Sequence, residues 1–256
     1  GLWYLLVGAL ILAAISLVDD YKNLPVLFRL LAHMGVAITC LILTPVIGVL
    51  NLIIATLALV WMTNLYNFMD GTDGLAGGMA VIGFSALGIA AWWMKGEELA
   101  LLCAALASAT LAFLRFNFPP AKIFMGDAGS IPLGFLAAAL AVYGIAQHYW
   151  QVLFPVMVFS PFIADASVTL TKRALRGEKI WHAHREHYYQ RWVRMGCTHR
   201  QLALAAYALM LACSLAALGL IKLPTYAAMI TTLWLATMML VFIATDLRWT
   251  HFNHDI

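Results

Sequence analysis

Charged residues are scarce in this sequence, at 11% of 256 residues, whereas hydrophobic residues make up 64%. A soluble protein of this length needs a larger charged surface, so the composition excludes that class and is typical of a polytopic membrane protein. The cysteines form no pair with metal-ligand spacing and imply no disulfide framework. We interpret them as packing residues: Cys40, Cys103, Cys197 and Cys213.

The start of the chain has no basic stretch ahead of its first apolar run. That run therefore does not have the form of a signal peptide. The first residue is Gly1 rather than methionine, and we expect an N-terminal portion to precede it. We interpret residues 1–256 as a single integral-membrane domain.

Nine apolar segments follow one another along the chain, and most approach the ~20 residues that a helix needs to span a bilayer. The second and third are divided only by Pro45 and Gly48, and Pro45 fits either a tight turn or a kink. The sequence predicts an all-α polytopic membrane bundle of about nine spans, at about 2–18, 26–44, 46–63, 75–94, 98–115, 131–147, 150–171, 201–221 and 225–245.

Positive charge predicts the orientation of these spans. Of 15 Lys and Arg residues, eight lie within 172–200, and this loop is therefore expected in the cytoplasm. Alternation along nine spans then places the polar stretches 19–25, 64–74, 115–130 and 172–200 on the same side. We expect the active site to be built from these cytoplasmic loops.

The stretch 64–78 combines acids, amides and glycines between two apolar runs. Asn64, Asn67, Asp70 and Asp73 are spaced three apart, so neighbouring members share a helix face. Two carboxylates, two amides and free backbone can bind a divalent cation and a polyphosphate. An EF-hand is excluded because the required glutamate is missing. A polar loop between membrane helices is the alternative.

Two other polar stretches contribute acids. Asp19 and Asp20 are adjacent and repel each other unless a cation lies near them, although solvation of a helix end explains them equally. Asp127 follows a glycine among small residues that leave room for a metal and a phosphate. Phe124 precedes it and can stack on a flat ring or anchor the chain at the interface.

The loop 172–200 is the most polar part of the chain. His182 and His184 share a side only in an extended segment, whereas from residue 184 onward the spacing predicts a short amphipathic helix at the membrane surface. The surrounding arginines favour a phosphate over a zinc ion as the ligand. Elsewhere, Arg29 and His33 lie one turn apart, and Asp165 lies inside the seventh apolar segment, where a carboxylate needs a partner.

Taken in order, these motifs resemble a known family. A DD pair after a span, NxxNxxDGxDGLAGG, NFPPAKIFMGDAGS and a basic HxH loop are similar to those of the polyprenyl-phosphate N-acetylhexosamine-1-phosphate transferases. That family includes phospho-MurNAc-pentapeptide translocase and the enzymes that initiate O-antigen and enterobacterial common antigen. The resemblance covers roughly residues 10–200. It implies about two further N-terminal spans, and so an eleven-span parent in the bacterial inner membrane.

The resemblance also implies roles for individual residues. Asp127 would be a Mg²⁺ ligand (Mn²⁺ being a substitute), with Asp19 and Asp20 at the phosphate-accepting end of the catalytic site. The metal and nucleotide pocket would include Asn67, Asp70 and Asp73. The nucleotide-sugar would also meet Asn117 and Phe124 near uracil, with His182, His184 and Arg185 at the diphosphate.

The implied reaction transfers HexNAc-1-phosphate from a UDP-sugar to undecaprenyl phosphate. Asn23 stands where the translocase has a lysine, and HAHREH replaces its run of histidines, which favours the O-antigen branch with GlcNAc or a 6-deoxy-HexNAc such as FucNAc or QuiNAc. Translocase-like activity and a secondary transporter are the alternatives; a transporter predicts acids inside spans and broken helices. We expect membrane lipids and no nucleic acid as partners, and a homodimer is left open.

Overall fold

The computed structural model describes residues 1–44, 48–179 and 184–254, and in this part of the chain every regular element is a helix. The predicted all-α fold is confirmed. The predicted turn at Pro45 lies outside the described residues. The elements are α1 (Trp3–Lys22), α2 (Val26–Leu43), α3 (Val49–Phe68), α4 (Leu75–Trp93), α5 (Glu97–Asn117), α6 (Asp127–Ala146), α7 (Leu153–Val158), α8 (Ser160–Leu175), α9 (Tyr188–Arg194), α10 (His199–Lys222), the short 3₁₀ helix η1 (Pro224–Tyr226) and α11 (Ala227–His254).

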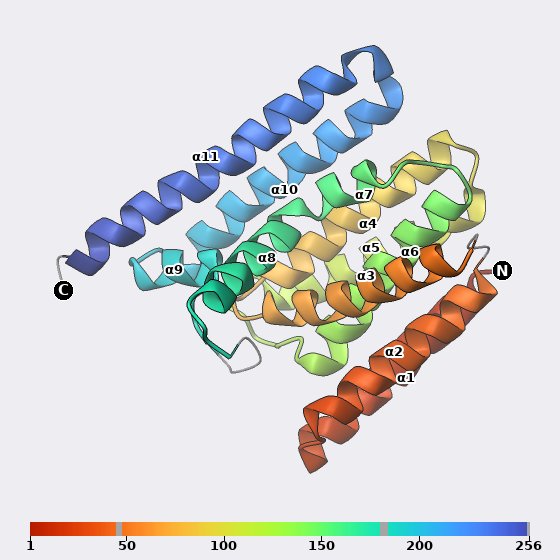
Figure 1. The fold of residues 1–256 in the computed structure, drawn as a ribbon, viewed down its shortest axis with the longest axis horizontal. Coiled ribbons are helices and arrows are strands. Elements are labelled where there is room, and N and C mark those ends of the chain that lie inside the picture. The colour runs from red at the N-terminus through yellow and green to blue at the C-terminus, as the bar shows by residue number, and fades with distance from the viewer. Residues whose placement is uncertain (45–47, 180–183, 255–256) are drawn as a thin grey trace.

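Eight helices of the described chain are long and apolar enough to cross a membrane. They are α1 to α6, α10, and α11 together with η1, and each coincides with one of the predicted apolar segments. The chain is therefore a multi-pass membrane protein. Figure 1 shows these helices running side by side, with α10 and α11 along one edge of the bundle and the α1–α2 hairpin along another.

The prediction of one continuous span over 150–171 was wrong. The structure breaks this segment at Phe159 into two helices, α7 and α8. Pro161 has no backbone N–H and cannot donate to the carbonyl of Met157. The Ser160 hydroxyl donates to that carbonyl instead, at 2.7 Å. In Figure 1, α7 begins after a loop that runs back from one end of the bundle, and α8 continues toward the other end, where α9 lies.

Helix α4 lies at the centre of the bundle and α11 at its edge. In the most apolar stretch of each helix, 72% of the residues of α4 are buried but only 6% of those of α11. Glycines bring the neighbours of α4 close, since a Cβ at Gly88 would lie 3.1 Å from Cys103 Cβ on α5. Helices in a membrane gain no hydrophobic driving force for association, because lipid is as apolar as their side chains. They associate instead through close packing at small residues.

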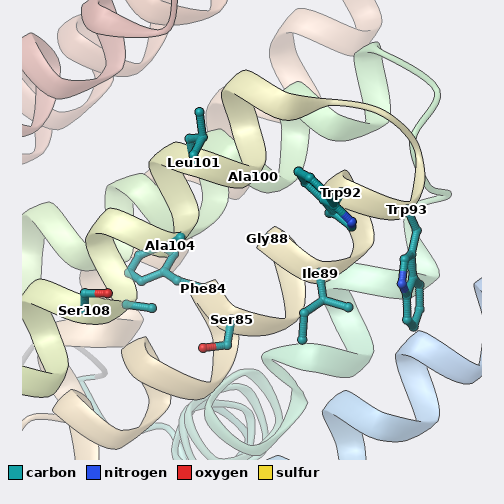
Figure 2. A pocket seen from close by; sticks show the side chains of 11 residues that line it. Phe84, Ser85, Gly88, Ile89, Trp92, Trp93, Ala100, Leu101, Ala104 and Ser108 are labelled. Atoms are coloured by element: carbon teal, nitrogen blue, oxygen red, sulfur yellow. The ribbon is translucent and has the colours of Figure 1, made fainter.

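An apolar groove of about 540 Å³ lies between α4 and α5, at the end of the bundle where Trp92 and Trp93 are found (Figure 2). Its lining includes Ile89, Leu101 and two serines, and none of its eleven residues is ionisable. The groove has no chemistry of its own and lies at the opposite end of α4 from the Asp70 loop. The functional site is therefore sought at the other end.

Candidate active site

Three of the four polar stretches contact one another at one end of the bundle. The Gly74 N–H donates to Asn117 Oδ1 at 2.9 Å, which joins the loop after α3 to the end of α5. The Tyr189 hydroxyl donates to the Phe68 carbonyl at 3.0 Å, which joins the same loop to α9. Segments separated by more than a hundred residues in sequence therefore form one polar surface.

Asn117 holds two of these loops together. Its side chain is buried, accepts from Gly74 N and donates from Nδ2 to the Ile123 carbonyl at 2.9 Å. Both ends of the amide are thus used within the protein. The predicted place of Asn117 near uracil stays a prediction, and the structure adds a role in fixing the backbone around the acids.

Asp70 and Asp127 form the electrostatic centre of this surface. Asp127 is the first residue of α6, where the helix N-terminus stabilises a negative charge. Burial, and then the negative charge of Asp127, raise the pKa of Asp70 to about 7, although a hydrogen bond from the Gly126 backbone acts in the opposite direction. Two carboxylates that repel each other in this way are stabilised when a cation is shared between them.

Asn67 and Asp73 flank this pair in different ways. Asn67 Nδ2 donates to Ser130 Oγ at 3.2 Å, and that hydroxyl donates in turn to the Gly126 carbonyl at 3.0 Å. Asp73 uses one oxygen to accept from Ala121 N at 3.0 Å and places the other 3.4 Å from His199 Nδ1. Asn67 therefore borders the Asp70–Asp127 pair, whereas Asp73 ties its own loop to neighbouring segments.

The described residues contain no group of three or more His, Cys, Asp or Glu side chains that could hold a metal ion. Two carboxylates are nevertheless compatible with Mg²⁺, which usually keeps several waters and is bound by one or two carboxylates together with substrate phosphates. The charge coupling of Asp70 with Asp127 therefore fits the predicted cation. Ser130 was not among the predicted site residues, although it closes the GDAGS motif that contains Asp127.

The two adjacent acids after α1 occupy different environments. Asp19 is mostly buried, accepts from Leu24 N at 2.7 Å and forms an ion pair with Arg29 at 2.7 Å. Asp20 is exposed. Asp19 therefore closes the α1–α2 hairpin, and of the two acids Asp20 is the one whose carboxylate faces solvent. On α2, His33 is 5% exposed and interacts electrostatically with Arg29 and Asp127.

The basic side of the site is represented by His184 and Arg185, because His182 lies outside the described residues. His184 is not helical, and its Nδ1 accepts from Glu186 N at 3.3 Å, which leaves the proton on Nε2. Burial, then His187 and Arg173, lower the pKa of His184 to about 4. It is therefore a neutral donor at pH 7, while Arg185 is exposed.

The acid predicted inside the seventh span organises this basic side. Asp165 on α8 accepts from the backbone of Tyr188 at 2.9 Å and of Tyr189 at 3.0 Å, and lies 3.1 Å from His187 Nδ1. It therefore caps the start of α9. A broken helix with a nearby acid is a feature of transporters, but here the acid is occupied by the backbone of α9, by His187 and by the Thr169 hydroxyl.

Phe124 stands apart from these contacts, with 76% of its surface exposed. It lies in the loop before α6, where it is open to a ligand or to the membrane interface. Its predicted contact with uracil stays a prediction.

The fold and the meeting of acidic and basic loops at one end define a multi-pass helical membrane protein with a polar site at the ends of its spans. The chain belongs to glycosyl transferase family 4, whose family model matches residues 2–145. That range contains every predicted acid of the site. The resemblance inferred from the motifs is thus confirmed at the level of the family.

Curated relatives carry two kinds of name. The chain is 31% identical over 219 residues to a "probable undecaprenyl-phosphate N-acetylglucosaminyl 1-phosphate transferase" of Bacillus subtilis (strain 168), covering 78% of this chain and 61% of that protein. It is 33% identical over 207 residues to a phospho-N-acetylmuramoyl-pentapeptide-transferase of Listeria monocytogenes serotype 4b, covering 70% and 63%. The protein of that name from Listeria welshimeri is 40% identical over 126 residues, covering 48% and 38%. The chain thus spans less than two thirds of the length of each.

Proposed function

We propose that this protein transfers a HexNAc-1-phosphate from a UDP-sugar to undecaprenyl phosphate and releases UMP. The observation that carries the proposal is the coupled pair Asp70–Asp127 on the same polar surface as the neutral donor His184 and the exposed Arg185. Family membership and the names of the relatives support it. Acids for a cation and donors for an anion are what a nucleotide diphosphate requires.

In the proposed reaction, an oxygen of the lipid phosphate attacks the β-phosphorus of the UDP-sugar. The bond between that phosphorus and the bridging oxygen breaks, and UMP leaves with the bond electrons. Both reactants are anionic, so the site must lower their repulsion. We favour direct attack by the lipid phosphate over a covalent aspartyl intermediate.

Each part of the polar surface has a role in this proposal. Asp70 and Asp127 would hold Mg²⁺, with Asn67 beside them. Mg²⁺, when bound, supplies charge neutralisation of the diphosphate and of the leaving UMP. His184 donates from Nε2 to a diphosphate oxygen, and Arg185 adds a second donor. Asp20 is exposed at the end of the α1–α2 hairpin and would lie at the phosphate-accepting end of the site.

The donor sugar is proposed to be GlcNAc or a 6-deoxy-HexNAc, for O-antigen or a related cell-envelope glycan. The HAHREH sequence, where the translocase has consecutive histidines, is the feature that favours this branch. The name of the Bacillus subtilis relative agrees with GlcNAc. The names of the Listeria relatives keep MurNAc-pentapeptide as the competing donor.

The test is an assay of full-length protein in membranes with undecaprenyl phosphate and a panel of UDP-HexNAc donors, including UDP-MurNAc-pentapeptide. We expect UMP release with UDP-GlcNAc or a 6-deoxy donor, dependent on added Mg²⁺. Release with UDP-MurNAc-pentapeptide alone would move the protein to the translocase branch. No release with any donor would contradict the proposed reaction.

The loop 172–200 is proposed to face the cytoplasm of a bacterial inner membrane. Cys197 is partly exposed, whereas the other three cysteines are buried, and so it reports on this loop once they are replaced. An impermeant thiol reagent should label Cys197 in inverted vesicles and not in intact cells. Labelling from outside intact cells would overturn the orientation and the placement of the site.

A further inference from the structure

Carboxylates contact helix α9 from two sides, in addition to the packing of Tyr189 and Trp192 against the core of the bundle. Asp165 of α8 caps its first residues. Below it lies a mainly apolar cavity of about 500 Å³, lined by Tyr188, Tyr189 and Trp192 of α9 and by residues of α8, α10 and α11. The directional bonds at its edges therefore act together with this packing in fixing the position of α9.

Asp246 of α11 provides the second edge. Its carboxylate accepts from Lys172 Nζ at 2.7 Å, from the Tyr188 hydroxyl at 3.0 Å and from Arg191 Nη1 at 2.9 Å. Three donors from two different segments thus meet one acid. This acid comes from the helix that is otherwise the least buried candidate span of the bundle.

Arg191 connects Asp246 to the backbone next to His184, because it bonds both Asp246 and Glu186. Its side chain is only 6% exposed, so its charge depends on a partner. While Nη1 bonds Asp246, Nε donates to the Glu186 carbonyl at 2.9 Å. The N–H of the same Glu186 donates to His184 Nδ1. A continuous series of bonds therefore runs from α11 to the imidazole of His184, the proposed donor to the diphosphate.

We propose that Asp246 is a positioning residue for the UDP-sugar: it orients Arg191, which fixes the backbone at Glu186 and hence the Nε2–H of His184. This inference rests on the proposed function. It gives α11 a part in the site although α11 contributes no residue to the acid pair. It also assigns Lys172 and Arg191 to Asp246 rather than to the diphosphate.

The test measures UMP release by the full chain, with either UDP-GlcNAc or undecaprenyl phosphate varied. D246N should raise the KM for UDP-GlcNAc roughly tenfold and leave the KM for the lipid unchanged, because only donor binding is misaligned. D246E keeps the carboxylate and should have a KM for UDP-GlcNAc close to that of the wild type. Thr237→Val is the matched control, since Thr237 lies on the same helix and its hydroxyl donates to the Leu233 carbonyl of that helix; it should change neither KM.

A second variant separates positioning from a general loss of stability. Arg191→Lys keeps the charge but cannot bridge Glu186 and Asp246 with one planar group. It should raise the same KM, and adding D246N to it should have little further effect, because both act through one contact. Additive effects, equal changes in both KM values, or a wild-type KM in D246N would overturn the inference.

Hydrogen exchange of the full chain keeps this inference distinct from the proposed reaction. D246N should speed amide exchange in 184–191 and not in 69–75. If wild-type protein released no UMP but this pattern held, the reaction would be wrong and the link from α11 to the loop would stand. If the protein were active and exchange in 184–191 did not change, the link would be wrong.

Discussion

The acidic half of the site (67–74 and 117–130) and the basic half (172–194) are held in place differently. Contacts to backbone groups fix the acidic half, as Asn117 does at Gly74 and Ile123. Carboxylates from distant helices fix the basic half: Asp165 accepts from the backbone N–H of Tyr188, and Asp246 forms an ion pair with Arg191. The comparison teaches that a side-chain amide within the site holds the loops around the acids, whereas the proposed diphosphate donors depend on carboxylates elsewhere in the chain.

The largest effect is expected where the acidic half carries the chemistry. Asp127→Asn should lower turnover at least ~100-fold, or roughly 2.7 kcal/mol of transition-state stabilisation, because a charged cation ligand is lost. UMP release over a range of Mg²⁺ concentrations measures this. Glu97→Gln removes the same charge at the start of α5 and should have no effect. Near-normal turnover of Asp127→Asn at limiting Mg²⁺ would remove Asp127 from the metal site.

The next effect concerns the donors of the basic half. His182→Ala and His184→Ala should each lower activity roughly 10–100-fold, since a hydrogen bond to a charged group contributes about 1.5–3 kcal/mol. The loss should be similar for all accepted donors, because phosphate contacts carry no information about the sugar. Metal analysis of purified protein is the control. Stoichiometric zinc in the wild type, absent from both variants, would show that HxH is a zinc site.

Removing the Asn117 side chain, which holds the loops of the acidic half together, should lower the stability of the protein. Asn117→Ala leaves the buried N–H of Gly74 without a partner and frees the partly buried carbonyl of Ile123, and should lower the free energy of unfolding by about 1–3 kcal/mol. Thermal or denaturant unfolding in detergent measures it. Asn64→Ala is the matched control, because Asn64 bonds only the Val60 carbonyl of its own helix. Equal losses in the two variants would mean that Asn117 does not join the loops.

The smallest effect is a pH dependence of the basic half. His184 has a pKa of about 4 in the folded protein against 6.5 for a free imidazole. As the pH falls from 6.5 towards 4, the unfolded chain binds a proton that the folded one does not, so stability falls in that window and is unaffected above it. Unfolding midpoints at pH 7.5 and 5 should differ less in His184→Gln than in the wild type. An identical difference would contradict the buried, neutral state of His184.

The positions of most spans and the grouping of the polar loops could be predicted from the sequence, because long apolar runs and clustered arginines are local signals. The helix break at Phe159 could not be predicted, because the apolar run continues through it and only Pro161 interrupts the backbone hydrogen bonds. The DD motif suggested two equivalent acids, yet Arg29 pairs with Asp19 alone. Asp246 lay at the end of an ordinary apolar segment, and its partners on α8 and α9 are more than fifty residues away. Contacts of that range leave no pattern in a single sequence.

The attachment of α11 to α9 has a consequence for the order of assembly during synthesis. Residue 246 is translated after Lys172, Tyr188 and Arg191, so these three side chains emerge from the ribosome before their common acceptor exists. The contacts of Asn67 with Ser130 and of Asn117 with Gly74 can, by contrast, form once α6 has been inserted. A nascent chain can therefore bring Asp70 and Asp127 together early, whereas the loop 184–191 reaches its final arrangement only when α11 has entered the bilayer.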